Sequence, residues 1–163
     1  MAKAQAILDG PDRPTKVMAI ASAGGHFVQL LRCRPAWSGC DVFYVSTDAG
    51  YAPMVEPNRL IEVTDGNRKA PIAMLRSACH IAAIVWKERP DVVFSTGAAP
   101  GLLALVLGRA LGARTVWLDS IANVEKMSLS GRLAGWVADL WLTQWSDLAK
   151  KSTRGVQYSG AVV

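Results

Sequence analysis

The feature that most constrains the fold is a short apolar run that ends in a glycine turn and leads into a helical pattern. Residues 16–22 read KVMAIAS, and an apolar run of this length predicts a buried strand. Residues 23–25 form the turn, and residues 26–34 carry apolar side chains at helical spacing. A strand, a glycine turn and a helix in this order are typical of the start of a Rossmann-like unit.

The same alternation of strand-like and helical segments continues along the chain. Further strands are predicted at 41–47, 59–63, 91–95, 114–118 and 140–143, with a short final strand or tail from 157. Helices are predicted at 71–87, 100–111 and from 128 or 130 to 138, with a turn or helix at 144–151. Residues 48–57 read as a loop and residues 64–69 as a turn. The alternation predicts an α/β fold whose mostly parallel sheet has helices on both faces. We expect residues 16–163 to form one Rossmann-like domain behind a flexible lead-in at residues 1–15.

Composition narrows the class of protein further. The 163 residues are 51% hydrophobic, and the 18 Lys and Arg residues outnumber the 13 Asp and Glu residues. That excess suits anionic partners, which include phosphates, an anionic membrane surface and nucleic acid. No apolar stretch approaches the ~20 residues of a membrane-spanning helix, so we expect any membrane contact to be peripheral. The three cysteines have neither disulfide-framework nor zinc-site spacing, so we expect reduced thiols.

Three polar or glycine-rich segments follow predicted strands, at the positions where open α/β sheets bind ligands. These segments are residues 22–26, 95–97 and 119–126. Because the carboxyl ends of parallel strands meet at one edge of a sheet, we expect the three segments to lie close together. In the first segment, Gly24 and Gly25 allow a ligand to approach the backbone at a helix N-terminus, which favours a phosphate.

The side chains of these segments are the candidate functional groups. His26 is either a general base near neutral pH or a hydrogen-bonding contact to a ligand. Ser95, Thr96 and Gly97 either hold a sugar or phosphate or only cap the helix that follows. The third segment supplies Asp119, Ser120, Asn123 and Glu125. Either carboxylate of that segment is an alternative general base or a ligand for sugar hydroxyls, although charged loops are often only solvated.

Standard nucleotide and hydrolase signatures are missing from the chain. It contains no G-x-G-x-x-G after the first strand, no G-x-x-x-x-G-K-[ST] and no G-x-S-x-G. Ordinary NAD enzymes, P-loop NTPases and α/β-hydrolases are therefore disfavoured. Trp136, Trp141 and Trp145 gather in the C-terminal quarter. They form a membrane-interface surface, a face for a partner subunit, or part of the core.

A series of short motifs resembles the Alg-fourteen-like oligosaccharide-biosynthesis subunits. The motifs are, in order, ASAGGH at 21–26, VQLL at 28–31, FSTG at 94–97, DSIA at 119–122, VEK at 124–126, SLSGR at 128–132, ADL at 138–140, QW at 144–145 and YSG at 158–160. The bacterial exopolysaccharide branch, typified by PssD, is the most similar. The first turn also resembles the Gly-Gly-His loop of MurG, the single-chain peptidoglycan N-acetylglucosamine transferase.

The resemblance implies a split glycosyltransferase of the GT-B type. This chain would match the N-terminal Rossmann half, which binds a polyprenyl-diphosphate-linked sugar acceptor and recruits the enzyme to the membrane surface. A separate donor-binding subunit would supply the UDP-sugar, for transfer of N-acetylglucosamine or glucuronic acid, and would be needed for activity. The pair would act in the cytoplasm, peripherally at the inner face of the cell membrane. The resemblance implies no metal, no cofactor and no nucleic acid.

The resemblance also implies roles for individual residues. Gly24 and Gly25 would face the acceptor diphosphate. The remaining acceptor contacts would be Ser95, Thr96, Gly97, Ser120 and Asn123. The base that removes the proton of the acceptor hydroxyl would be His26, Asp119 or Glu125. Two alternatives stay open: a self-sufficient small Rossmann-like nucleotide-binding enzyme, and a non-catalytic membrane scaffold for a partner.

Overall fold

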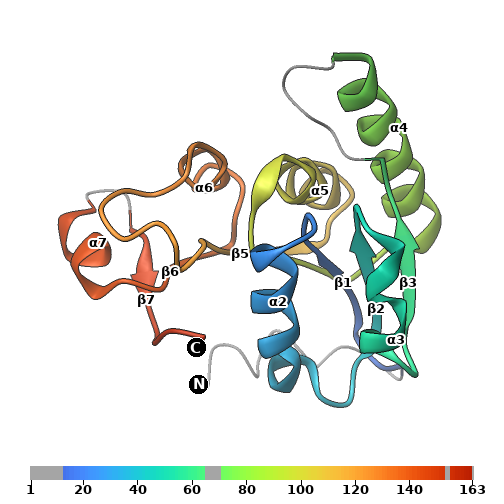
Figure 1. The fold of residues 1–163 in the computed structure, drawn as a ribbon, viewed down its shortest axis with the longest axis horizontal. Coiled ribbons are helices and arrows are strands. Elements are labelled where there is room, and N and C mark those ends of the chain that lie inside the picture. Colours follow the sequence, from blue (N-terminus) through green and yellow to red (C-terminus); the bar gives the residue numbers. More distant parts are fainter. Residues whose placement is uncertain (1–12, 65–70, 153–154, 163) are drawn as a thin grey trace.

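The described part of the chain folds around a parallel sheet of seven strands. The computed structural model describes residues 13–64, 71–152 and 155–162, and Figure 1 shows its ribbon. The strands are β1 (Lys16–Ile20), β2 (Asp41–Ser46), β3 (Arg59–Glu62), β4 (Val92–Ser95), β5 (Arg114–Leu118), β6 (Leu140–Thr143) and β7 (Gln157–Tyr158). Their order is β3-β2-β1-β4-β5-β6-β7, and every neighbouring pair is parallel. The predicted α/β class is confirmed.

Helices and short 3-10 turns connect the strands. They are α2 (Gly25–Arg32), η1 (Arg34–Trp37), η2 (Ala49–Tyr51), α3 (Ala52–Val55), α4 (Pro71–Glu88), α5 (Ala98–Ala110), α6 (Leu129–Ala134) and α7 (Ser146–Lys151). The predicted turn at 64–69 lies outside the described residues except for residue 64. The predicted lead-in at 1–15 lies outside them except for residues 13–15.

Two predicted boundaries are wrong for identifiable reasons. The stretch 48–57 is not a plain loop, because the Asp48 carboxylate accepts the Gly50 N–H at 2.8 Å and begins η2, which runs into α3. Helix α6 ends at Ala134, four residues before its predicted end. The chain turns there so that the Asp139 N–H can donate to the Thr115 carbonyl of β5 at 2.9 Å.

Alternate residues of each strand build one hydrophobic core on each face of the sheet. Met18 and Ile20 of β1 face the core formed with α4, α5 and α6. Val17 and Ala19 face the other core, which α2 and Trp37 cover. Figure 1 shows helices on both sides of the sheet. Because both faces are buried, the strands read as nearly continuous apolar runs, and the predicted two-sided covering is confirmed.

The strand order reverses between β1 and β4. After β1 the chain adds β2 and β3 on one side, and then crosses back to place β4 against the other side of β1. In an open α/β sheet, a reversal of this kind leaves a crevice at the carboxyl ends of the two central strands. The loops that follow β1 and β4 are therefore the expected position of a ligand site.

Candidate functional site

Two hydrogen bonds join the loops that follow β1 and β4. The Nδ1 atom of His26 lies 3.0 Å from the carbonyl oxygen of Thr96. The Thr96 hydroxyl donates in turn to the carbonyl oxygen of His26 at 2.6 Å. His26 lies in the first turn of α2, and Thr96 directly follows β4. The structure therefore brings the first two predicted segments together at the strand-order reversal.

The bond to Thr96 determines where the His26 imidazole carries its hydrogen. A carbonyl oxygen can only accept, so Nδ1 must be the donor. In the neutral ring the lone pair therefore sits on Nε2, which has no hydrogen-bond partner among the described residues. His26 is only partly buried. This arrangement leaves Nε2 able to accept a proton from a bound hydroxyl group.

Gly97 provides the space that the His26 ring occupies. Its φ is +144°, a conformation that favours glycine, and a Cβ atom there would lie 2.4 Å from Nδ1 of His26. Ser95 and Thr96 are fully buried, and the Gly97 N–H donates to the Ser95 hydroxyl at 3.2 Å. The segment 95–97 therefore lies beneath His26 and supports it, and its two hydroxyl groups are turned into the protein.

Gly24 and Gly25 form the exposed entry to α2. A Cβ atom added at either glycine would meet nothing within 4 Å. Helix α2 has no side-chain cap at its N-terminus and no acidic residue in its first turn. The Gly24 N–H donates to the Tyr51 hydroxyl at 2.8 Å, and the Phe27 N–H donates to the Gly24 carbonyl at 3.1 Å. The amides of Gly25 and His26 have no hydrogen-bond partner among the described residues, so together with the helix dipole they favour an anion beside the His26 ring.

Asp119 is a buried anchor of the loop that follows β5. Its side chain is 1% exposed, and its carboxylate accepts four hydrogen bonds. The donors are Trp117 Nε1 at 3.2 Å, Asn123 Nδ2 at 3.1 Å, and the Ser128 N–H and hydroxyl at 3.0 and 2.7 Å. Four donors occupy the lone-pair sites of a carboxylate, so Asp119 is placed as a structural group and is poorly suited to be the base.

Two buried glutamines, which sequence reasoning did not assign to the site, join α2 to that loop. Gln29 Nε2 donates to the Ser120 hydroxyl at 3.2 Å, and Gln29 Oε1 accepts from Ile121 N–H at 3.0 Å and from Gln144 Nε2 at 2.6 Å. Gln29 lies one turn after His26, so the network fixes the helix that carries His26. The sequence does hold a signal for this network, since Gln29 lies beside the apolar face of a predicted helix. An amide buried there must have hydrogen-bond partners.

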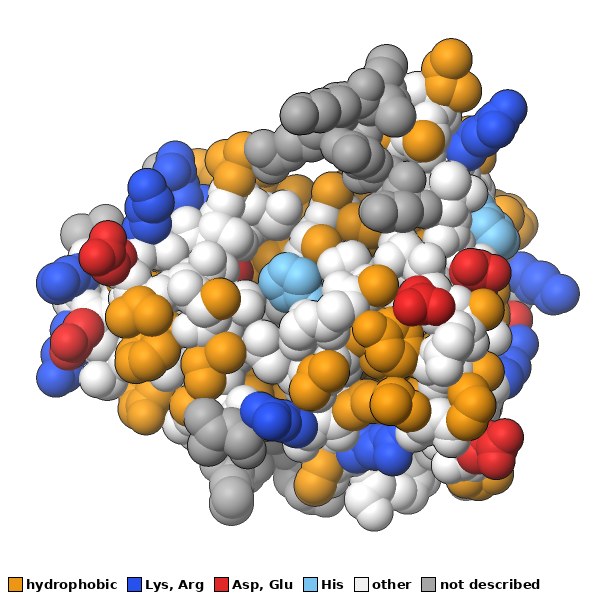
Figure 2. Space-filling view, viewed as in Figure 1, with side chains coloured by type: hydrophobic (Ala, Val, Ile, Leu, Met, Phe, Trp, Pro, Cys, Tyr) orange, Lys and Arg blue, Asp and Glu red, His pale blue; other side chains and the backbone are white. Residues whose placement is uncertain are grey.

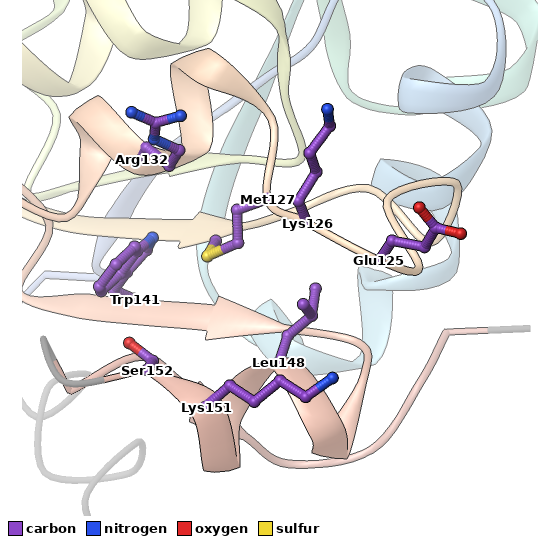
Figure 3. Close-up of a pocket in the computed structure, with 8 residues that line it drawn as sticks. All are labelled: Glu125, Lys126, Met127, Arg132, Trp141, Leu148, Lys151 and Ser152. Atoms are coloured by element: carbon purple, nitrogen blue, oxygen red, sulfur yellow. The ribbon is translucent and has the colours of Figure 1, made fainter.

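Glu125 lies apart from His26. It is exposed and lines a pocket of about 370 Å³ near α6 and α7, drawn in Figure 3. No hydrogen bond between described residues connects Glu125 to the His26 loop. The three candidate bases therefore do not meet at one point, and His26 alone lies at the strand-order reversal. Among the described residues, no three His, Cys, Asp or Glu side chains gather as a metal site.

The C-terminal tryptophans do not share one surface. Trp141 is buried and donates to the Gly131 carbonyl at 2.8 Å. Trp145 is half-buried and donates to the Ile121 carbonyl at 2.8 Å. Trp136 is 71% exposed. Core packing therefore explains Trp141, and Trp136 is the member of the group that a membrane or partner can reach.

Sequence comparisons match the chain to one family. The model of the family described as "Oligosaccharide biosynthesis protein Alg14 like" matches residues 46–162. The "UDP-N-acetylglucosamine transferase subunit ALG14" of Eremothecium gossypii is 27% identical, over 94% of this chain and 83% of its own length.

Solved structures match the fold. MurG of Acinetobacter baumannii aligns with a TM-score of 0.70 at 17% identity, over 91% of this chain and 46% of MurG. A UDP-N-acetylglucosamine 2-epimerase aligns with a TM-score of 0.66 at 10% identity, over 91% of this chain and 49% of its own. The chain thus spans about half the length of these structures. At such identities the likeness shows the fold alone, and one fold serves more than one reaction.

Proposed function

The chain belongs to the family of Alg14-like oligosaccharide biosynthesis proteins, and on that premise we propose that it is the acceptor-binding subunit of a two-chain UDP-N-acetylglucosamine transferase. Its acceptor is a polyprenyl-diphosphate-linked sugar of polysaccharide or oligosaccharide biosynthesis. A separate donor-binding chain supplies the UDP-sugar and completes the cleft, which agrees with the match to about half of MurG. The relatives' name favours N-acetylglucosamine over glucuronic acid as the transferred sugar.

The observation that carries this proposal is the position of His26. Its ring stands at the strand-order reversal, with Nδ1 held by the Thr96 carbonyl and Nε2 free of described partners. The open helix N-terminus at Gly24 and Gly25 lies directly beside it. A proton acceptor next to an anion site is the pair of groups needed to orient a diphosphate-linked sugar and to activate one of its hydroxyl groups.

The same geometry gives a balanced transfer step. The N-terminal amides of α2 bind the acceptor diphosphate and place an acceptor hydroxyl near Nε2 of His26. As the hydroxyl oxygen forms its bond to the anomeric carbon of the donor, Nε2 takes the proton. The bond from that carbon to UDP breaks, and UDP leaves with the electron pair. The Thr96 carbonyl then stabilises the imidazolium through the Nδ1–H that it already accepts.

Contact with the membrane is proposed at the N-terminal end of α4. No helix of the described residues is long and apolar enough to cross a bilayer. In the first two turns of α4, the side chains of Ile72 and Leu75 are 70% and 65% exposed. Arg76, which follows Leu75, is also exposed. Figure 2 shows hydrophobic and basic side chains over this end of α4. Because α4 runs antiparallel to the strands, this end lies at the same edge of the sheet as His26, so a shallow peripheral contact presents the site to a lipid-linked substrate.

Binding of a short polyprenyl-diphosphate-linked N-acetylglucosamine to the isolated chain tests the proposal. Calorimetry would compare the wild type with Gly25→Asp and Gly25→Asn, two side chains of equal size in an open space. The aspartate repels the diphosphate, and we expect it to weaken binding about ten-fold relative to the asparagine. No binding by the wild type, or equal binding by the two variants, would contradict the proposed acceptor site.

A further inference from the structure

The pocket between α6 and α7 is rimmed by cations that have no described partner. Lys126 from the loop before α6, Arg132 from α6 and Lys151 from α7 line a space of about 370 Å³. None of the three side chains forms an ion pair or hydrogen bond with another described residue. Lys150 provides the contrast, because it is the neighbour of Lys151 in α7, does not line the pocket, and pairs with Asp147 at 3.8 Å.

The interior of the pocket is apolar. Met127, Trp141 and Leu148 line it, and Figure 3 shows the charged groups of Arg132 and Lys126 on one side of these side chains and that of Lys151 on the other. Figure 2 shows Lys and Arg side chains, with Asp and Glu side chains among them, at the α6 and α7 end of the molecule. A volume of this size exceeds that of a bare phosphate and suits a small organic molecule.

The fourth charged group of the pocket is Glu125, an exposed carboxylate. A carboxylate only accepts hydrogen bonds, so it complements a hydroxyl group on the organic part of a ligand. Among the described residues that line the pocket, three cations and one carboxylate leave an excess of two positive charges. A phosphate group offers three acceptor oxygens and up to two negative charges, so it satisfies this rim better than a single carboxylate does.

We propose that this pocket binds a hydroxyl-bearing organic phosphate. The long side chains of Arg132, Lys126 and Lys151 turn toward the phosphate from the two sides of the pocket, and Glu125 binds a hydroxyl group. Met127, Trp141 and Leu148 contact the carbon skeleton. The phosphate can belong to a soluble sugar or polyol phosphate or to the headgroup of an anionic phospholipid. The site is separate from the His26 loop and does not depend on the function proposed above.

Nuclear magnetic resonance of the full chain gives a site-specific test. Glycerol 3-phosphate is the soluble probe, and vesicles of phosphatidylglycerol, compared with phosphatidylcholine, are the lipid probe. We expect the Trp141 indole signal to move on titration. Arg132→Gln and Lys151→Gln should each weaken binding on the order of ten-fold, while the matched control Lys150→Gln leaves it unchanged. The His26 ring signal reports the other site, so failure here is distinguishable from failure of the acceptor site.

Each outcome decides the proposal. A response to glycerol 3-phosphate that the pocket variants lose supports a soluble phosphate ligand. A response only to phosphatidylglycerol vesicles, lost in the same variants, supports the phospholipid headgroup. An unmoved Trp141 signal with both probes overturns the proposal. So does equal weakening by Lys150→Gln, or equally strong binding of glutarate, since each would mean that general surface charge governs binding.

Discussion

His26 owes its position to two residues that lie far from it in the sequence. The Thr96 carbonyl orients the ring, and the absence of a side chain at Gly97 gives the ring its space. Both residues are buried. At the scale of single residues, the candidate site is thus one ring nitrogen without a described partner, with a supporting turn beneath it.

Replacing Gly97 with alanine tests that support. The new Cβ atom would collide with His26, and the backbone φ of +144° would be strained as well. Gly112→Ala is the matched control, because its φ is +90° but nothing lies within 4 Å of a Cβ there. In urea denaturation, we expect the free energy of unfolding to fall by about 1 kcal/mol in Gly112→Ala, from backbone strain alone. It should fall by at least about 2 kcal/mol in Gly97→Ala, where the collision with His26 adds to the strain. Equal losses would mean that His26 does not fill the space at Gly97.

Removing the imidazole tests its role in transfer. In a reconstituted pair, we expect His26→Ala to lower kcat by about 10²–10⁴-fold, the range for loss of a general base, without preventing assembly. His80→Ala on the exposed face of α4 is the control and should leave kcat unchanged. Full activity of His26→Ala would favour the non-catalytic scaffold and contradict the proposed role.

At the scale of elements, the strands and the main helices were predictable because the information is local. The strands are buried on both faces and therefore stand out as apolar runs, and α4 and α5 have helical spacing. The 3-10 turn at η2 was missed because it begins with one side-chain hydrogen bond, which the Asp48 carboxylate accepts from the Gly50 N–H. The end of α6 was missed because it depends on pairing between Asp139 and β5.

The candidate site was predictable only in part, for the same reason. The glycine turn, His26 and their approach to residues 95–97 follow from the strand–turn–helix pattern. The Asp119 carboxylate accepts hydrogen bonds from Ser128 and Trp117, and these bonds exist only after the loop has folded. The pairing of Gln29 with Gln144 joins residues 115 positions apart.

Glu88 at the end of α4 connects that helix to two strands and gives the fold a pH dependence. Hydrogen bonds from Arg59 of β3 and Lys16 of β1 lower the pKa of Glu88 from 4.5 to about 2. A lowered pKa stabilises the folded chain above the unfolded value near 4.5, and this stabilisation is lost as the pH falls toward 2. Because Arg59 is about half exposed, water screens its ion pair with Glu88. We therefore expect ionised Glu88 to contribute about 1–2 kcal/mol to the free energy of unfolding.

Denaturation of Glu88→Gln across pH 3 to 7 checks this stabilisation. The variant should be less stable than the wild type at pH 7, and the difference should shrink as the pH falls below about 4.5. Glu62→Gln, an exposed residue of β3, serves as the control and should change stability little. A constant difference between Glu88→Gln and wild type over this range would show that ionisation of Glu88 does not contribute.

At the scale of the whole molecule, the features that we propose bind a lipid-linked acceptor lie at one edge of the sheet. His26, the open N-terminus of α2 and the exposed apolar end of α4 all lie at the carboxyl ends of the strands. The chain is similar to about half of MurG, and MurG is 46% covered by it. That a second chain binds the donor is the central claim of the proposed function.

The most direct test is a transfer assay with radiolabelled UDP-N-acetylglucosamine and a polyprenyl-diphosphate-linked sugar acceptor. The purified chain would be assayed alone and after co-expression with a candidate donor-binding subunit. We predict product only from the pair, and loss of product when either chain is omitted. Transfer by this chain alone would contradict the half-enzyme and identify it as a self-sufficient enzyme.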